Sequence, residues 1–317
     1  MPNPARPISA STALAGVLGD PVRHSLSPAM HNAALAALGL DWAYLALPVT
    51  AADLAAVLAG LRAIDCRGLN VTLPHKQEAA RLATRLTPLA ARLGAVNTLV
   101  PLAEGGWLGT NTDVEGFLSP LRPSPAATAA GSTSRWHGRQ ALVLGCGGSA
   151  RAVVAALAEL GLARILVAGR HPESLARFIA GCGSWAPGLA ALAWPAGERG
   201  GTDDDGALLG ALADSDLIVN TTPVGMASKQ DPEAAKRCPL AADQLQSLRP
   251  GSTVYDLIYV PRPSSLLKAA AERGCIPIDG LEMLVNQGAA SLRLWTGLAE
   301  VPLAVMRQAA LQRLEAA

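Results

Sequence analysis

A buried-strand pattern runs directly into a glycine-rich turn and then into a helix, and this succession constrains the fold more than any other feature. Residues 141–144 read Ala-Leu-Val-Leu, and Gly145-x-Gly147-x-x-Ala150 follows at once. The first glycine of such a turn permits the tight bend, the second lets a phosphate approach the backbone, and the small third residue lets the helix pack on the strand. Amides at the start of the helix face the phosphates. The pattern predicts a dinucleotide-binding turn, although a glycine-rich turn alone would also fit unrelated α/β proteins.

Strands alternate with helices along the chain, which favours an α/β fold with mostly parallel sheets. The 317 residues are enough for two domains of ordinary size. Residues 121–135 are rich in proline, alanine, serine and threonine, a composition typical of a flexible connector, and we place the first domain boundary just before them. Residues 181–206 mix glycine, proline and tryptophan with a run of aspartates, and we expect an irregular insertion there.

Composition and charge exclude several classes of protein. The formal net charge is +1 at pH 7, so bulk electrostatics do not favour nucleic acid or an anionic membrane as a partner. No stretch approaches the ~18 uncharged apolar residues of a membrane span, and the first residues lack the apolar core of a signal peptide. The five cysteines are dispersed without a C-x-x-C pair, which indicates free thiols in a reducing cytoplasm. The five histidines show no metal-ligand spacing, so we expect no metal.

The residues after the next predicted strand bear on the choice between NAD and NADP. That strand covers residues 164–168 and is followed by Gly169, Arg170 and His171, with no carboxylate to accept the ribose hydroxyls of NAD. A guanidinium group matches the geometry of a 2′-phosphate. The pattern therefore favours NADP, and a solvated surface arginine is the alternative interpretation of Arg170.

A lysine and an aspartate each follow a predicted strand end in the first half of the chain. Lys76 comes after a proline-containing turn, and Asp113 ends the motif Asn111-Thr112-Asp113. Substrate sites in parallel α/β sheets lie at the carboxyl ends of strands. A partly desolvated lysine, oriented by an aspartate, can give a proton to the alkoxide that hydride transfer creates and can take it back in the reverse reaction. Their separation in the chain alone would favour a surface lysine and a helix-capping aspartate, and the hydroxyl and carboxamide residues around them change that interpretation.

Hydroxyl and carboxamide side chains accompany this pair, and such groups can grip a small polyhydroxylated acid. Ser25 and Ser27 flank a turn and can donate to a carboxylate, while Ser27-Pro28 also fits a helix N-cap followed by proline in the first turn. Turn formation and pairing with the backbone are the alternative roles for such polar residues. The candidates for substrate binding are Ser25, Ser27, Asn70, Thr72, Asn97, Tyr259 and Gln287.

Taken together, these motifs resemble the shikimate dehydrogenase family. The resemblance runs in order from Gly16 to Gly297, and many ordered motifs are far more specific than any one of them. The matching motifs are Gly19-Asp20-Pro21, Ser25-Leu26-Ser27-Pro28, Asn70-Val71-Thr72, Lys76, Gly94-Ala95-Val96-Asn97-Thr98, Asn111-Thr112-Asp113, Gly145-Cys146-Gly147-Gly148-Ser149-Ala150, Asn220-Thr221-Thr222-Pro223, Tyr255-Asp256 and the stretch from Gly280 to Gln287.

The resemblance implies NADPH-dependent reduction of 3-dehydroshikimate to shikimate, on the route to chorismate and the aromatic amino acids. It implies an N-terminal α/β substrate domain over residues 1–118, completed by C-terminal helices in 282–317, and a Rossmann domain for NADP over 119–281, with a cleft between them. It further implies that Lys76 is the acid/base and Asp113 its partner, that Ser25 and Ser27 hold the substrate carboxylate, and that the remaining candidates contact hydroxyls or shape the pocket.

The family likeness also implies a set of cofactor contacts, with three departures from the family pattern. The usual Asn-Arg-Thr at the 2′-phosphate is Gly169-Arg170-His171 here, Glu282 replaces a glycine, and the segment 181–206 is longer than usual. The implied cofactor-binding residues are Gly145, Cys146, Gly147, Gly148, Ser149, Ala150, Gly169, Arg170, His171, Ser174, Thr221, Thr222, Leu257, Gly280 and Met283.

Two other functions remain as alternatives to the biosynthetic enzyme. One is an NAD-dependent quinate/shikimate dehydrogenase with a catabolic role, against which Arg170 argues. The other is a catalytically inert sensor on the same fold, which should have lost its proton-transfer residues, whereas this chain keeps Lys76 and Asp113. In each case we expect a small-molecule ligand and a monomer or homodimer, with no nucleic acid or membrane as partner.

Overall fold

The computed structural model describes residues 8–122, 134–194, 203–227 and 231–316. Its contacts divide the chain into two compact units, Met1–Gly116 with Leu284–Ala317, and Phe117–Met283. The sequence placed these divisions after residues 118 and 281. Most of the expected connector at 121–135 lies outside the described residues, as do residues 195–202 of the expected insertion.

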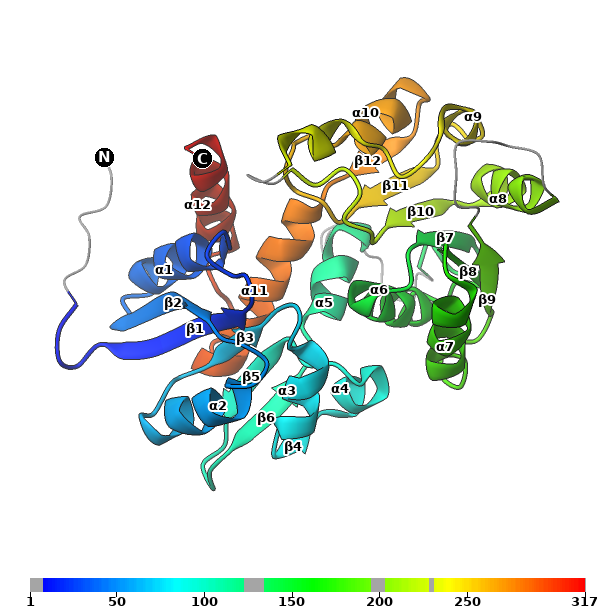
Figure 1. The fold of residues 1–317 in the computed structure, drawn as a ribbon. Coiled ribbons are helices and arrows are strands. Elements are labelled where there is room, and N and C mark those ends of the chain that lie inside the picture. The colour runs from blue at the N-terminus through cyan, green and yellow to red at the C-terminus, as the bar shows by residue number, and fades with distance from the viewer. Residues whose placement is uncertain (1–7, 123–133, 195–202, 228–230, 317) are drawn as a thin grey trace. The chain divides into compact units, whose positions relative to one another are not determined.

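The first unit is built on a six-stranded mixed sheet (Figure 1). Three neighbouring strands are parallel, whereas the fifth strand of the chain runs antiparallel to both of its neighbours. Its amino end therefore lies at the same edge as the carboxyl ends of the strands beside it. In sheet order, the strands are β2 (Trp42–Pro48), β1 (Ala13–Gly19), β3 (Leu69–Val71), β5 (Thr98–Pro101), β6 (Trp107–Thr110) and β4 (Arg85–Leu86).

Helices cover this sheet, and the first of them begins differently from its predicted start. Helix α1 starts at Ser27, so the N-cap position belongs to Leu26, and Ser27 is not the cap that the sequence predicted. The Leu26 backbone is already helical, and the Ser25 hydroxyl accepts a hydrogen bond from the Ser27 amide at 3.2 Å. Helix α1 spans Ser27–Ala37. The other helices of this unit are α2 (Leu54–Ala63), α3 (Lys76–Leu82), α4 (Pro88–Leu93), α11 (Gly280–Thr296), which begins in the second unit, and α12 (Leu303–Glu315).

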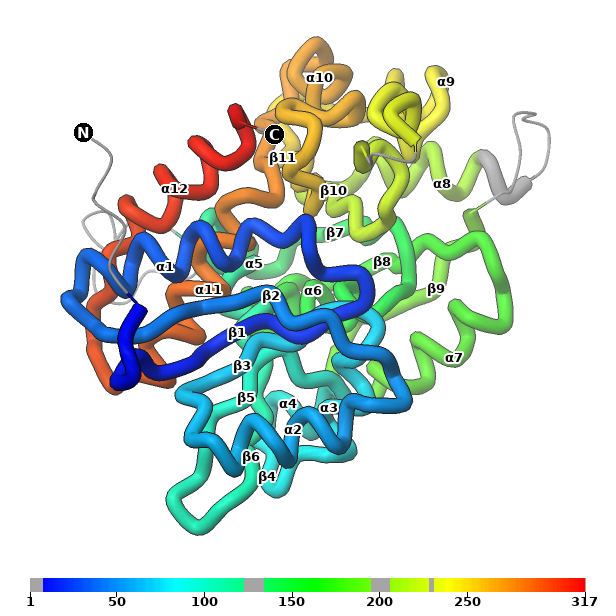
Figure 2. The backbone as a smooth tube through the Cα atoms, turned by 60° about the vertical axis from the view of Figure 1, so that its left-hand side comes forward, coloured from blue at the N-terminus to red at the C-terminus, as the bar shows by residue number. Residues whose placement is uncertain are grey.

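The C-terminal helices complete the first unit. Helix α12 packs beside α1, as both views show (Figures 1 and 2). On α11, Gln287, Ser291 and Trp295 follow one another at intervals of four residues and so lie on one face of the helix. The Trp295 indole donates to the carbonyl of Leu99 at 3.0 Å, which ties that face to β5. Within the described ranges, no helix is long and apolar enough to cross a membrane.

The second unit is a doubly wound sheet in which every strand pairing is parallel. The strand order reverses between β7 and β10, and the crevice for a dinucleotide in such sheets lies at this reversal. In sheet order the strands are β12 (Ile276–Ile278), β11 (Thr253–Asp256), β10 (Leu217–Asn220), β7 (Gln140–Leu144), β8 (Arg164–Gly169) and β9 (Leu189–Ala193). The helices are α5 (Asp113–Leu118), which crosses the division between units, α6 (Gly148–Glu159), α7 (Pro172–Cys182), α8 (Asp203–Asp214), α9 (Ala242–Gln246) and α10 (Ser265–Glu272), with short 3₁₀ turns at Ser119–Leu121 and Pro232–Lys236.

The prediction of an irregular insertion at 181–206 is wrong for the described part of that segment. It contains the end of α7, the strand β9 and the start of α8. Strand β9 has the sequence Leu-Ala-Ala-Leu-Ala, which has no β-branched or aromatic residue and therefore a weak intrinsic strand signal. Pairing with β8 along its full length makes it the edge strand, so a tertiary interaction overrides the local preference.

Candidate active site

The topology of the first sheet brings three of the candidate residues to one edge. Lys76 is the first residue of α3, one short turn beyond the carboxyl end of β3, and Asp113 is the first residue of α5, just beyond the carboxyl end of β6. Asn97 lies directly before the amino end of β5, which the antiparallel pairing places at the same edge. Lys76, Asp113 and Asn97 therefore meet although they come from three separate strand ends.

Lys76 and Asp113 form an ion pair that is largely shielded from water. The Lys76 Nζ donates to Asp113 Oδ2 at 2.6 Å, and the side chains are 17% and 10% exposed. The second carboxylate oxygen, Oδ1, accepts from the Asn97 amide Nδ2 at 2.7 Å. Because both oxygens are engaged, the carboxylate has one fixed orientation, and it fixes the position of the ammonium group in turn. Removing either partner would leave a poorly solvated charge.

The Asn97 carboxamide is itself held by the motif that contains Asp113. Its Oδ1 accepts from the backbone amide of Thr112 at 2.7 Å and from the Thr98 hydroxyl at 3.0 Å. Its Nδ2 also lies 3.5 Å from Oε1 of Gln287 on α11. Because its oxygen is occupied by Thr112 and Thr98, the Asn97 carboxamide turns its NH₂ group toward Asp113. Asn97 therefore acts as the donor that orients the carboxylate.

A second buried carboxamide, Asn70 on β3, links the strand edge to α11. Its Nδ2 donates to Ser291 Oγ at 2.9 Å and to the carbonyl of Asn97 at 3.2 Å. Its Oδ1 accepts from the Tyr44 hydroxyl at 2.7 Å, and burial raises the pKa of this phenol, which keeps it a donor. Every polar atom of the Asn70 side chain thus has a protein partner, and Asn70 supports the backbone on which Asn97 sits.

Tyr44 belongs to a buried aromatic stack that also contains His31. The two rings lie 4.2 Å apart between centroids and are 10° from parallel, and the Trp295 ring lies 5.5 Å from the His31 ring, tilted by 41°. Neither ring nitrogen of His31 has a hydrogen-bond partner among the described residues. Desolvation lowers the pKa of His31 from 6.5 to about 3, so the ring is neutral in the folded protein.

The hydroxyls of Ser25, Ser27 and Thr72 lie at the same sheet edge, and the Ser27 side chain is hydrogen-bonded to Tyr44. Ser25 and Ser27 follow the carboxyl end of β1, and Thr72 follows that of the parallel neighbour β3. The Thr72 methyl group packs against Gly19, and a Cβ atom added to residue 19 would lie only 2.5 Å from the Thr72 Cγ2 atom. Among the described residues, these three hydroxyls make no hydrogen bond to Lys76, Asp113 or Asn97, so their hydrogen-bonding capacity is not used by that group.

Sequence reasoning did not select Tyr44, His31, Thr98, Thr112 or Ser291 as functional residues. Thr98 and Thr112 stood inside recognised motifs, and their hydroxyls lie 3.0 Å apart. Ser291 lies one helical turn after Gln287 on the same face of α11, a spacing that could have indicated it. Tyr44 offered only one signal, which was an aromatic residue in a chain with few of them.

In the second unit, the glycine turn has the geometry that a dinucleotide requires. Gly145 has a φ of +101°, and a Cβ there would lie 2.8 Å from Thr221 Oγ1 and 2.9 Å from Thr222 Cγ2. A Cβ on Gly147 or Gly148 would meet only open space. No side chain of the described residues caps the amino end of α6, so its first amides are available to a diphosphate. The turn therefore has no room for a side chain at Gly145, whereas the space beside Gly147 and Gly148 is open to a ligand.

The other implied cofactor residues follow the carboxyl ends of neighbouring parallel strands. Gly169 ends β8, and Arg170 and His171 follow it with exposed side chains. Ser174 on α7 accepts a hydrogen bond from Arg177 Nη2 at 3.3 Å, which places a second arginine, missed in the sequence, near this strand end. Around the same edge lie Cys146, Ser149 and Ala150 near β7, Thr221 and Thr222 after β10, Leu257 and Tyr259 after β11, and Gly280 and Met283 after β12.

Comparison with known proteins identifies the family. Profiles described as "Shikimate dehydrogenase substrate binding domain" and "Shikimate 5'-dehydrogenase C-terminal domain" match residues 17–99 and 280–311. A curated shikimate dehydrogenase (NADP(+)) from Synechococcus sp. (strain JA-3-3Ab) is 49% identical over 98% of this chain and 97% of its own length. The chain belongs to the shikimate dehydrogenase family. A second curated shikimate dehydrogenase (NADP(+)), from Synechocystis sp. (strain ATCC 27184 / PCC 6803 / Kazusa), is 46% identical over 97% of this chain and 98% of its own length.

Solved structures of this shikimate dehydrogenase family share the fold. The Thermus thermophilus shikimate 5-dehydrogenase, solved with NADP(H) and shikimate, has a TM-score of 0.76 at 35% identity and covers 95% of this chain and 99% of its own. The Listeria monocytogenes enzyme, solved with shikimate and NAD, has a TM-score of 0.81 at 31% identity and covers 96% and 98%. The predicted family and the α/β fold with a Rossmann unit are thereby confirmed.

Proposed function

We propose that this protein catalyses the reversible NADPH-dependent reduction of 3-dehydroshikimate to shikimate, on the route to chorismate and the aromatic amino acids. One observation carries the proposal, namely the shielded Lys76–Asp113 pair held by Asn97 in a chain that matches curated NADP-dependent shikimate dehydrogenases over nearly its whole length. The inert-sensor alternative has no support in this site, because both proton-transfer residues are present and oriented.

The chain's own contribution to the chemistry is the movement of one proton. Bound NADPH supplies the hydride for the ketone carbon. Lys76 donates a proton from Nζ to the ketone oxygen as negative charge grows on it, and in the oxidative direction the same amine takes the proton back. Asp113 holds the amine in place through the 2.6 Å contact. General acid–base catalysis of this kind contributes about 10²- to 10⁴-fold to a rate.

Three further hydroxyls at the same sheet edge are suited to bind the substrate. We assign Ser25 and Ser27 to the carboxylate and Thr72 to a ring hydroxyl, since none of the three is hydrogen-bonded to Lys76, Asp113 or Asn97. We also assign Asn97, which lies beside Asp113, and Gln287, which lies beside Asn97, to ring hydroxyls. Asn70 shapes the pocket through the Asn97 backbone, and we assign Tyr259 to a further hydroxyl of the substrate.

The glycine turn and the end of β8 are suited to hold NADP. The amides of Gly148, Ser149 and Ala150 face the diphosphate, and the missing Cβ of Gly145 keeps the turn in contact with Thr221 and Thr222. Arg170 is exposed after the carboxyl end of β8, where the ribose of a dinucleotide binds in such folds, and the stretch Gly169-Arg170-His171 contains no carboxylate. The 2′-phosphate therefore pairs with Arg170.

Arg170→Gln should raise the KM for NADP about tenfold to a hundredfold, because a charge-assisted contact to phosphate is worth ~1.5–3 kcal/mol. The KM for NAD should stay unchanged, since NAD lacks the 2′-phosphate. Arg164→Gln, at the exposed amino end of the same strand, is the control and should change neither value. Steady-state kinetics with both cofactors measure the effect, and an equal rise in both KM values would contradict the assignment.

The activity itself is tested by the absorbance of the reduced nicotinamide. Purified protein is mixed with shikimate and NADP, and the assay is repeated with NAD and with quinate. We expect fast reduction with shikimate and NADP and slow reduction in the other combinations. Faster reduction with NAD, or equal use of quinate, would favour the NAD-dependent quinate/shikimate dehydrogenase instead, and the replacements at Gly169 and His171 are the observation on which that second candidate rests.

The cellular location and the oligomeric state of the enzyme are part of the same proposal. We infer a cytoplasmic enzyme that acts as a monomer or homodimer on small-molecule ligands. The five cysteines are all free thiols in the structure, which supports a reducing compartment. Sedimentation equilibrium of the purified protein measures the oligomeric state.

A further inference from the structure

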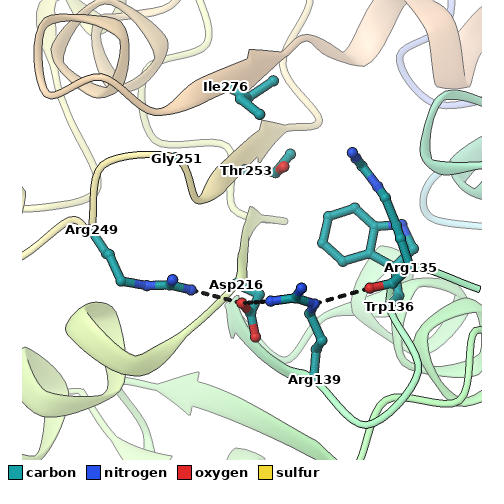
Figure 3. Close-up of a pocket in the computed structure, with 8 residues that line it drawn as sticks. All are labelled: Arg135, Trp136, Arg139, Asp216, Arg249, Gly251, Thr253 and Ile276. Carbon is teal, nitrogen blue, oxygen red and sulfur yellow. Dashed lines mark hydrogen bonds and ion pairs between the residues drawn. The ribbon is translucent and has the colours of Figure 1, made fainter.

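A small cavity lies at the amino ends of the strands of the second sheet (Figure 3). It measures about 160 Å³, and its lining includes Asp216 directly before β10, Thr253 at the start of β11 and Ile276 at the start of β12. The strands are parallel, and the glycine turn follows the carboxyl end of β7. The cavity is therefore on the opposite edge of this sheet from the residues assigned to the cofactor.

The charges that line the cavity leave a positive excess. The lining contains three arginines, Arg135, Arg139 and Arg249, and a single carboxylate, Asp216. Asp216 Oδ1 accepts from Arg139 Nη1 at 2.6 Å and from Arg249 Nη2 at 2.7 Å. Although desolvation opposes it, these hydrogen bonds hold the pKa of Asp216 below its usual range, so the carboxylate stays ionised. Three positive charges and one negative charge leave the cavity with a net charge of two positive.

Asp216 fixes the two arginines that it pairs with. Its Oδ1 accepts from both guanidinium groups, and its Oδ2 accepts from the backbone N–H of Gln140 at 3.3 Å. Each guanidinium has five N–H donors, so the pairing leaves donors on both arginines unused by the carboxylate. The Arg139 Nε also donates to the carbonyl of Arg135 at 3.0 Å, as the dashed line in Figure 3 shows. The two arginines are therefore held in place before any ligand arrives.

Arg135 is positioned by an aromatic ring instead of a carboxylate. Its guanidinium carbon lies 4.3 Å from the centroid of the Trp136 ring. That ring is buried, and its Nε1 donates to the carbonyl of Leu121 at 3.0 Å, so the stacking surface is fixed. Among the described residues, no carboxylate lies within ion-pair distance of Arg135. Its full positive charge is thus presented beside the pair held by Asp216.

We propose that this cavity binds a phosphate group, held by Arg135, Arg139 and Arg249. A phosphate dianion would neutralise the excess of two positive charges, and its oxygens match the forked donors of guanidinium groups. The Thr253 hydroxyl lies on the wall as a further polar group, and Figure 3 shows it among the three arginines. The phosphate belongs either to inorganic phosphate or to a small phosphate ester.

The test is isothermal titration calorimetry of the full-length protein with inorganic phosphate, at constant ionic strength set with chloride. Saturating NADP is present throughout, so that phosphate does not bind at the cofactor contacts. We expect one phosphate per chain, and Arg135→Gln should weaken binding about tenfold, the effect of losing one charge-assisted contact. A second titration series with glycerol 3-phosphate distinguishes the two sources. Tighter binding of glycerol 3-phosphate than of inorganic phosphate would identify a site for a phosphate ester, and the reverse order would identify a site for free phosphate.

Arg164→Gln is the matched control, since Arg164 is an exposed arginine on the same sheet edge that does not line the cavity. It should leave the affinity for phosphate unchanged. Both variants should keep the kcat for shikimate oxidation, which separates a failure of this proposal from a failure of the proposed function. No binding to the NADP-loaded wild-type protein, or equal binding by Arg135→Gln and wild type, would overturn the proposal.

Discussion

Replacing Lys76 by alanine should lower kcat for shikimate oxidation by about 10³-fold, because the variant loses the group that moves the proton in the transition state. The 2.6 Å contact with Asp113 shows that the ammonium group is held in one position, which is what a general acid needs. Binding of shikimate should weaken far less than kcat, since the serine and threonine hydroxyls remain. Stopped-flow and steady-state kinetics measure kcat, and equilibrium titration measures the affinity.

The loss of Lys76 also leaves Asp113 without its partner in a poorly solvated place, so folding must be checked separately. Lys76→Met keeps much of the aliphatic packing and should show the same loss of kcat with a circular dichroism spectrum like that of wild type. Lys268→Ala, an exposed lysine on α10, is the control and should keep full activity. Near-wild-type kcat in both Lys76 variants would refute the assignment of the proton to this residue.

Acidification should destabilise the first unit through His31, by about 2 kcal/mol near pH 5. The unfolded chain protonates this histidine below its ordinary pKa of 6.5, whereas burial lowers the pKa in the folded protein to about 3. Between these two values the unfolded state therefore binds more protons, and the free energy of unfolding falls as the pH falls. The loss begins near 6.5 and reaches its full size below about 3.

Comparison with His31→Phe isolates this contribution. Phenylalanine can keep the stack on Tyr44 but cannot be protonated. Urea unfolding at about pH 8 and about pH 5 gives the drop in free energy of unfolding for each protein, and the drop should be smaller by roughly 2 kcal/mol in the variant. Packing changes affect both pH values alike and cancel. His24→Gln, at an exposed position of the same unit, should behave as wild type does. An equal drop in His31→Phe and wild type would exclude His31 as the cause.

The parts of the site that the sequence predicted are those encoded by neighbouring residues. The turn at Gly145 follows from a strand, a spacing of glycines and a helix, all within a short stretch. Asn97 was a candidate for substrate binding, but the sequence did not indicate that the antiparallel pairing of β5 with β3 would place it at an amino strand end on the same edge. That pairing joins distant segments, and no local pattern announces it.

The supporting residues were missed for the same reason. Tyr44 becomes relevant only because β2 and β3 both flank β1, and its hydroxyl reaches Asn70 from there. Ser291 becomes relevant only because α11 returns to the first unit near the end of the chain. Strand β9 had only a weak local signal, since its leucines and alanines do not specify a strand until β8 supplies a partner.

The return of α11 has a consequence for biosynthesis of the protein on the ribosome. The first unit needs residues from both ends of the chain, whereas the second unit lies between them without a break. Until α11 emerges, Asn70 and Thr98 lack the Ser291 hydroxyl that both of them contact. The middle of the nascent chain can therefore reach its native fold first, and the hydrogen-bond network around Asn70, Thr98 and Asn97 is complete only when α11 has been translated.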